Sequence, residues 1–109
     1  MNQMDRIPRA IAHFDINNKH PELIKFERAS GVIFTNELLK SRLPYLIDLR
    51  DIFVNLMTEK YSFAEIGEMI NKDRTSIYNS AERFKYRYET YSEYRKLSDE
   101  IESKYKQLN

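Results

Sequence analysis

Hydrophobic residues in the second half of the chain recur with the period of α-helices. Between Tyr45 and Met57 they follow one another at steps of three and four, which predicts one buried helix face. Ile47 and Val54 lie on the opposite side of that helix. Because a helix that is apolar on two sides is usually covered on both, we expect N-terminal segments to pack over the second stripe. Two later helices are predicted by apolar positions at similar spacing: Ile77, Ala81, Phe84 and Tyr88, then Tyr94, Leu97, Ile101, Tyr105 and Leu108.

Polar residues mark where these helices begin. Ser62 and Glu65 have the spacing of a capping box, in which each side chain binds a free amide of the first turn. Asp73 is the predicted N-cap of the next helix. Thr90 and Glu93 form a second predicted capping box, which opens the last helix.

The N-terminal third predicts short helices joined by loops. Ile7–Phe14 is one candidate, and Pro21–Ala29 is a stronger one, with Gly31 available to end it. Asn36 is the expected cap of a third short helix, which stops near Leu43 because a proline follows. We therefore expect short covering helices over residues 1–43 and a helical domain over residues 44–109.

The composition supports an all-α fold and excludes several kinds of chemistry. The 109 residues include 2 glycines and 3 prolines, so few tight turns are available for a strand-rich fold. The absence of cysteine excludes disulfides and thiolate metal sites and is compatible with the cytoplasm. The sequence contains no apolar run long enough to cross a membrane and no signal-peptide core.

Candidate catalytic and metal-binding residues are few. The only histidines, His13 and His20, do not complete a zinc site without carboxylates, and no nucleophile elbow or phosphate-binding loop is present. The sequence therefore predicts neither an enzyme nor a bound metal or cofactor.

Residues Glu65 to Asn79 have the spacing of a helix-turn-helix. Ile66 and Ile77 are placed to pack the two helices together, Gly67 is small where they cross, and Asn71 suits the left-handed residue of the turn. This arrangement leaves the start and outer face of the second helix free to enter a DNA major groove.

The outer face of this second helix is predicted to carry Thr75, Asn79, Arg83 and Tyr86. Residues 72–87 contain five basic and two acidic side chains, although the whole chain has a net charge of only +1. Local basic excess favours nucleic-acid binding. The alternative at this point is a purely structural helix pair, because such pairs also occur in proteins that bind no DNA.

Two segments of the motif resemble a known family. Tyr-Ser-Phe-Ala-Glu-Ile-Gly at 61–67 and Asn-Lys-Asp-Arg-Thr-Ser-Ile at 71–77 are similar to the C-terminal DNA-binding domain of the bacterial replication initiator DnaA. The helices before and after the motif also have counterparts there, so the resemblance covers residues 44–108. It implies an all-helical, Trp-repressor-like helix-turn-helix domain.

The resemblance implies roles for individual residues. Lys72 stands where the family has arginine, and Asp73 matches an aspartate that contacts bases. Thr75 and Ser76 match two positions that contact bases or phosphate. Asn79 falls where the family often has a histidine near the DNA.

The sequence also departs from the family pattern. Arg74 replaces a histidine that helps to read the origin box, and Asn71 replaces glycine. Because arginine binds guanine O6 and N7 in a bidentate manner, we expect a different preferred DNA sequence. The family's basic loop has no clear equivalent, and Arg28, Lys40 and Arg42 are the only candidates for it.

The sequence thus predicts a protein that binds double-stranded DNA sequence-specifically, without an ATPase motor, in replication control or transcription regulation. The predicted contacts are Lys72, Asp73, Arg74, Thr75, Ser76, Asn79 and Arg83, the last as a phosphate contact. The alternative is a module of the same shape that docks a replication protein, such as an initiator or a polymerase subunit. The stripe from Tyr94 to Leu108 either folds back on its own domain or forms a homodimer.

Overall fold

The structure, a computed structural model, describes residues 18–108. Every regular element in this range is a helix, which confirms the predicted all-α class. In chain order the elements are α2 (Pro21–Ser30), α3 (Asn36–Lys40), α4 (Pro44–Met57), α5 (Phe63–Ile70), α6 (Arg74–Thr90) and α7 (Ser92–Gln107). The helix expected at Ile7–Phe14 lies outside the described residues.

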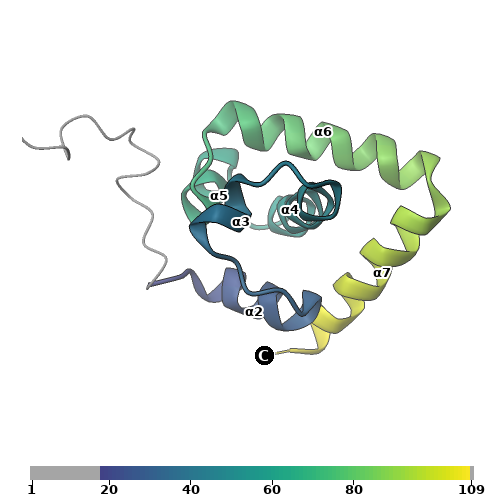
Figure 1. Cartoon of the computed structure of the whole chain (residues 1–109), viewed down its shortest axis with the longest axis horizontal. Helices are drawn as coiled ribbons and strands as arrows, with labels where there is room; N and C mark the ends of the chain where they lie inside the picture. Colours follow the sequence, from purple (N-terminus) through teal and green to yellow (C-terminus); the bar gives the residue numbers. More distant parts are fainter. Residues whose placement is uncertain (1–17, 109) are drawn as a thin grey trace, which may run out of the picture.

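Helix α4 occupies the centre of the fold and the other helices surround it, as its end-on view in Figure 1 shows. The face predicted from Leu46 to Met57 is buried, while Tyr45 at its start is exposed. On the opposite side Val54 is buried and Ile47 is half-buried. Helix α3 lies at this second side, where the guanidinium of Arg50 donates to the carbonyl of Leu38 at 3.1 Å. Helix α6 packs on the same side, so the N-terminal segments cover only part of the second stripe.

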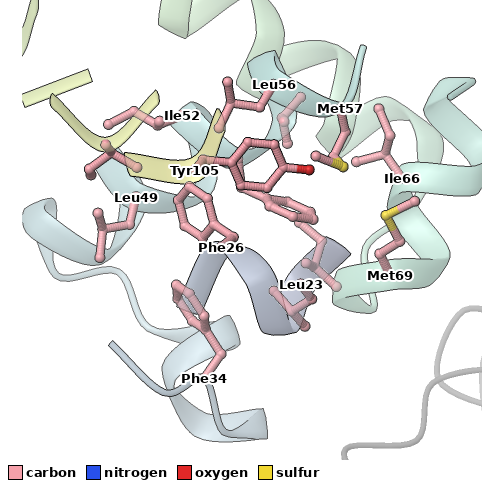
Figure 2. Packing of buried hydrophobic residues seen from close by; sticks show 14 of the residues in the cluster. Leu23, Phe26, Phe34, Leu49, Ile52, Leu56, Met57, Ile66, Met69 and Tyr105 are labelled. Carbon is pink, nitrogen blue, oxygen red and sulfur yellow. The ribbon is translucent and has the colours of Figure 1, made fainter. Parts of the chain in front are cut away.

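Residues from the N-terminal segment share one hydrophobic core with α4 (Figure 2). The ring of Phe26 meets that of Phe53 edge-on at 5.2 Å, and it stacks on Phe34 at 6.2 Å between centroids. Helix α2 ends at Gly31, which is in the left-handed conformation with φ 79°, as the sequence predicts. Segment 18–43 therefore contributes to the core from which α4 positions the later helices.

Helix α7 closes the ring by packing along α2 and α6 (Figure 1). Its expected inner residues Tyr94, Ile101 and Tyr105 are buried within the same chain, so the stripe folds back on its own domain. The hydroxyl of Tyr105 donates to Glu22 on α2, and this bond holds the pKa of the Glu22 carboxyl below its usual value.

Three details of the predicted helix ends are wrong. The N-cap of α3 is Thr35 rather than Asn36, because the Thr35 hydroxyl accepts from the amide of Leu38. Helix α3 also ends at Lys40, before Leu43, because Ser41 is already extended. The capping box at Thr90 is absent: Thr90 is still helical within α6, and Tyr91 serves as N-cap of α7 without a side-chain bond.

Candidate nucleic-acid interface

Helices α5 and α6 are joined by a tight turn that the sequence specifies at each position. The capping box of Ser62 and Glu65 opens α5, and Asn71 ends it in the left-handed conformation with φ 58°. The amide of Lys72 then donates to the carbonyl of Gly67 at 2.9 Å, which folds the chain back over the helix end. The predicted capping box at Ser62 and Glu65 and the predicted left-handed conformation of Asn71 are therefore confirmed.

Gly67 allows the backbone of this turn to approach α5 closely. A Cβ atom on Gly67 would lie 2.2 Å from the carbonyl oxygen of Lys72, and the colliding atom belongs to the backbone. The small residue predicted at the helix crossing is thus required by the turn itself. Lys72 and the start of α6 are fixed by this contact.

We expect Gly67→Ala to lower the free energy of unfolding by about 1–3 kcal/mol, because the turn must shift to accommodate the methyl group. Urea denaturation monitored by circular dichroism measures the loss. Glu68→Ala, an exposed change on the same helix, is the control and is expected to alter stability by less than about 0.5 kcal/mol. Equal stability of the Gly67→Ala protein and the wild type would contradict the close approach.

Asp73 is the N-cap of α6, as predicted. Its carboxylate accepts from the amide of Ser76 at 2.7 Å. This bond is the main reason that the pKa of Asp73 lies below its ordinary value of 3.8. One carboxylate oxygen is therefore engaged in starting the helix, and the side chain remains exposed at the surface.

We expect Asp73→Ala to cost about 1 kcal/mol of stability, and Asp73→Asn less, because asparagine also caps helices well. Since the folded pKa is lowered, the carboxylate stabilises the fold at pH above the unfolded pKa. This contribution is lost as the pH falls through the folded value. The difference in unfolding free energy between wild type and Asp73→Asn is expected at pH 7 and is expected to shrink steadily as the pH is lowered past the ordinary pKa of 3.8. A stability difference between the two proteins that does not change with pH would contradict a contribution from the charged carboxylate of Asp73.

The first turn of α6 presents polar side chains to solvent. Arg74 and Thr75 are exposed, and they line a shallow depression together with Phe63 of α5 and Tyr78 of α6. The rings of Phe63 and Tyr78 meet edge-on at 6.2 Å. An exposed arginine and an exposed hydroxyl thus lie beside a pair of aromatic rings.

Four of the predicted site residues line a second feature, a cleft of about 240 Å³ beside α6. Ser76, Asn79 and Arg83 of α6 form one side of it, with Lys72 from the turn that precedes α6. Lys40, the last residue of α3, and Arg42, between α3 and α4, lie on the other side. The remaining lining residues are Ile47 and Arg50 of α4, Ile70 of α5 and Ser80 of α6. We call this feature the basic cleft; among the described residues that line it, five are basic and none is acidic.

Arg50 is a cleft residue that the sequence did not predict, and the positions of Lys40 and Arg42 did not follow from the sequence either. Arg50 lies three residues after Ile47, so both are on the same side of α4, which a helical projection predicts. The missing information was tertiary: only the packing of α6 on α4 brings this side of α4 next to Asn79. Arg28, the third candidate for a basic loop, lies instead on α2 beside Ile24 and Lys25.

The basic cleft holds like charges together. The pKa of Lys72 lies below its usual value because burial removes the ammonium group from water, and because Arg50, Lys40 and Arg42 repel its charge. Burial is also the main cause that lowers the pKa of Arg50; attraction by Asp51 opposes this effect, and repulsion from Arg83 and Arg42 adds to it. An anion in this cleft would relieve the repulsion.

Arg83 is exposed, as predicted, but its guanidinium also has a partner within the fold. Nε and Nη2 donate to the two carboxylate oxygens of Asp51 on α4, at 2.7 and 2.9 Å. The Asp51 side chain is completely buried, with 0% exposure. One turn further along, Arg87 pairs with Asp48. Two ion pairs therefore fix the orientation of α6 on α4, a role of Arg83 that the sequence did not predict.

Comparison with known proteins finds no matching family model, no matching curated protein and no matching solved structure. Within residues 18–108, no helix is both long enough and apolar enough to span a bilayer. In the same range, histidine and carboxylate side chains form no group of three that could hold a metal ion.

Proposed function

We propose that this chain binds double-stranded DNA sequence-specifically through a helix-turn-helix formed by α5 and α6. The observation that carries the proposal is the basic cleft, which gathers five basic side chains from three separate segments next to the exposed first turn of α6. Basic groups that are clustered on one face are the usual electrostatic footprint of a nucleic-acid-binding protein.

The exposed start of α6 supports the same proposal. In helix-turn-helix proteins the first residues of the second helix contact base edges in the major groove. Arg74 and Thr75 occupy these positions, and both are exposed. The guanidinium of Arg74 forms no salt bridge within residues 18–108. In the proposed complex they read bases, while the basic cleft faces the phosphate backbone.

The resemblance to the DnaA C-terminal domain supports the class of activity. Its quoted segments, 61–67 and 71–77, fall on the capping box of α5 and on the turn and first residues of α6. We propose a cytoplasmic protein that acts in replication control or transcription regulation. Arg74, in place of the family's histidine, is expected to change the preferred sequence.

Selection from a random duplex library tests this proposal. The full chain is incubated with the library at low salt, and bound duplexes are amplified and sequenced over several rounds. We expect enrichment of one short motif, and tighter binding of the enriched duplex than of a scrambled duplex of equal length and composition. Failure to retain any duplex, or retention without enrichment, would contradict sequence-specific DNA binding.

The alternative function is a protein-docking module, and exposed tyrosines favour it. Tyr86 and Tyr91 meet edge-on at 6.2 Å, and both are more than half exposed. Aromatic side chains of this kind are enriched at protein interfaces. A docking module of this kind is expected to bind a replication protein with an affinity that does not depend on the DNA present, and to retain no duplex in the selection above.

A further inference from the structure

The charge of the basic cleft exceeds what a DNA backbone phosphate needs. Arg83 is neutralised by Asp51, but within residues 18–108 Lys40, Arg42, Arg50 and Lys72 form no salt bridge. Four cations therefore face one cleft. A backbone phosphodiester carries a single negative charge, and its neighbours along the strand are spread over the DNA surface.

The dimensions and donors of the cleft suit a small anion. Its volume of about 240 Å³ is below the range of about 300–1,000 Å³ that is typical of sites for drug-sized ligands. Ser76, Asn79 and Ser80 add hydroxyl and amide donors to the cationic groups. Charged donors and planar guanidinium groups are the side chains that bind phosphate oxygens most strongly.

We propose that the basic cleft binds a free oligophosphate, of which pyrophosphate is the simplest example. The several negative charges of such a group match the four cations that form no salt bridge within residues 18–108. Its oxygens accept from Arg42 and Arg50 on one side and from Lys72 and Asn79 on the other. The site itself does not depend on the DNA-binding proposal. A second consequence does rest on it: oligophosphate and duplex DNA compete for the cleft.

Isothermal titration calorimetry of the full chain with sodium pyrophosphate, at pH 7 and low salt without divalent metal, tests the site. Sulfate at matched ionic strength is the control for general anion attraction. We expect pyrophosphate to bind about tenfold or more tightly than sulfate, because it engages at least one more charge-assisted hydrogen bond. Equal affinity for the two anions, or no pyrophosphate binding, would overturn the proposal.

Three variants locate the binding. Arg42→Gln and Lys72→Gln each remove one cleft charge, and Lys96→Gln removes an exposed charge on α7, outside the cleft. Each cleft variant is expected to weaken pyrophosphate binding by about tenfold, and Lys96→Gln to leave it unchanged. Equal losses in all three would overturn the cleft as the site. Circular dichroism melting of each variant excludes unfolding as the cause of a loss.

Competition between pyrophosphate and DNA is measured in a separate experiment, in which pyrophosphate is titrated into the complex of the chain with a labelled duplex. Displacement that is weakened by Lys72→Gln supports competition at the cleft. Pyrophosphate binding without any duplex binding would support the anion site and contradict the proposed function. Duplex binding without pyrophosphate binding would support the proposed function and contradict the anion site.

Discussion

Arg83→Ala is expected to lower the free energy of unfolding by about 3–5 kcal/mol, the cost of leaving a buried charge without its partner. The carboxylate of Asp51 is completely buried, and the bonds from Arg83 are the only side-chain hydrogen bonds that it accepts within residues 18–108. Removing the guanidinium leaves this buried carboxylate without the side chain that donates to both of its oxygens. Urea denaturation at pH 7 measures the loss.

Two control variants separate this cause from a general effect of truncation. Arg87→Ala removes the neighbouring arginine, whose partner Asp48 is partly exposed to water, so we expect a loss of at most about 1 kcal/mol. Replacing Asp51 by asparagine in the Arg83→Ala background removes the buried charge, and it is expected to restore part of the stability. A loss below about 1 kcal/mol for Arg83→Ala itself would show that the pair behaves as a surface salt bridge.

This stability effect bears on the DNA contact predicted for Arg83. As a phosphate contact, its removal is expected to weaken binding to all duplexes alike and to reduce the salt slope by about one. Binding of Arg83→Ala must be compared at a temperature at which both proteins are folded. If the loss of duplex affinity disappears after correction for the fraction of folded protein, Arg83 acts only through its ion pair with Asp51 and not as a DNA contact.

Arg74→Ala is expected to cost about 1–3 kcal/mol in affinity for the selected duplex and to flatten the preference at one base pair. Arg74 is the first residue of α6 and is exposed, so its guanidinium can project ahead of the helix start toward guanine O6 and N7. Its removal breaks no hydrogen bond or ion pair within residues 18–108, so we expect the stability of the fold to change little.

The measurement for Arg74 compares matched and mismatched duplexes by fluorescence anisotropy. Lys85→Ala is the matched control, because Lys85 is also an exposed cation on α6 but is paired with Glu82 at 3.4 Å. Its loss is expected to be small and independent of sequence. Equal, sequence-independent losses for both variants would contradict a base-reading role for Arg74 while leaving DNA binding itself intact.

Local signals in the sequence predicted most of the fold. Ser62, Asn71 and Asp73 act through atoms a few residues away, so their chemistry is visible in the sequence, and each occupies its predicted position in the structure. Thr90 shows the limit of such signals. It has the right neighbours for a cap, but α6 continues through it because the helix already packs on α4 and α7.

The candidate site was harder to predict, because it depends on which helix faces meet. The first turn of α6 follows from the turn motif alone. The basic cleft requires that the end of α3, the residues just after it and the Arg50 side of α4 lie beside α6, which no local pattern specifies. The same holds for Asp51: an acidic residue in a largely apolar helix indicates a polar partner but does not identify Arg83 as that partner.

The dependence of duplex affinity on salt concentration tests the central claim most directly. For the wild type, a plot of log affinity against log salt concentration is expected to have a steep negative slope, with each phosphate contact contributing about −0.9. The Lys72→Gln variant is expected to show a shallower slope and weaker binding at low salt. No binding to any duplex at low salt, or an affinity that does not change with salt, would contradict a DNA-binding function for α6 and the basic cleft.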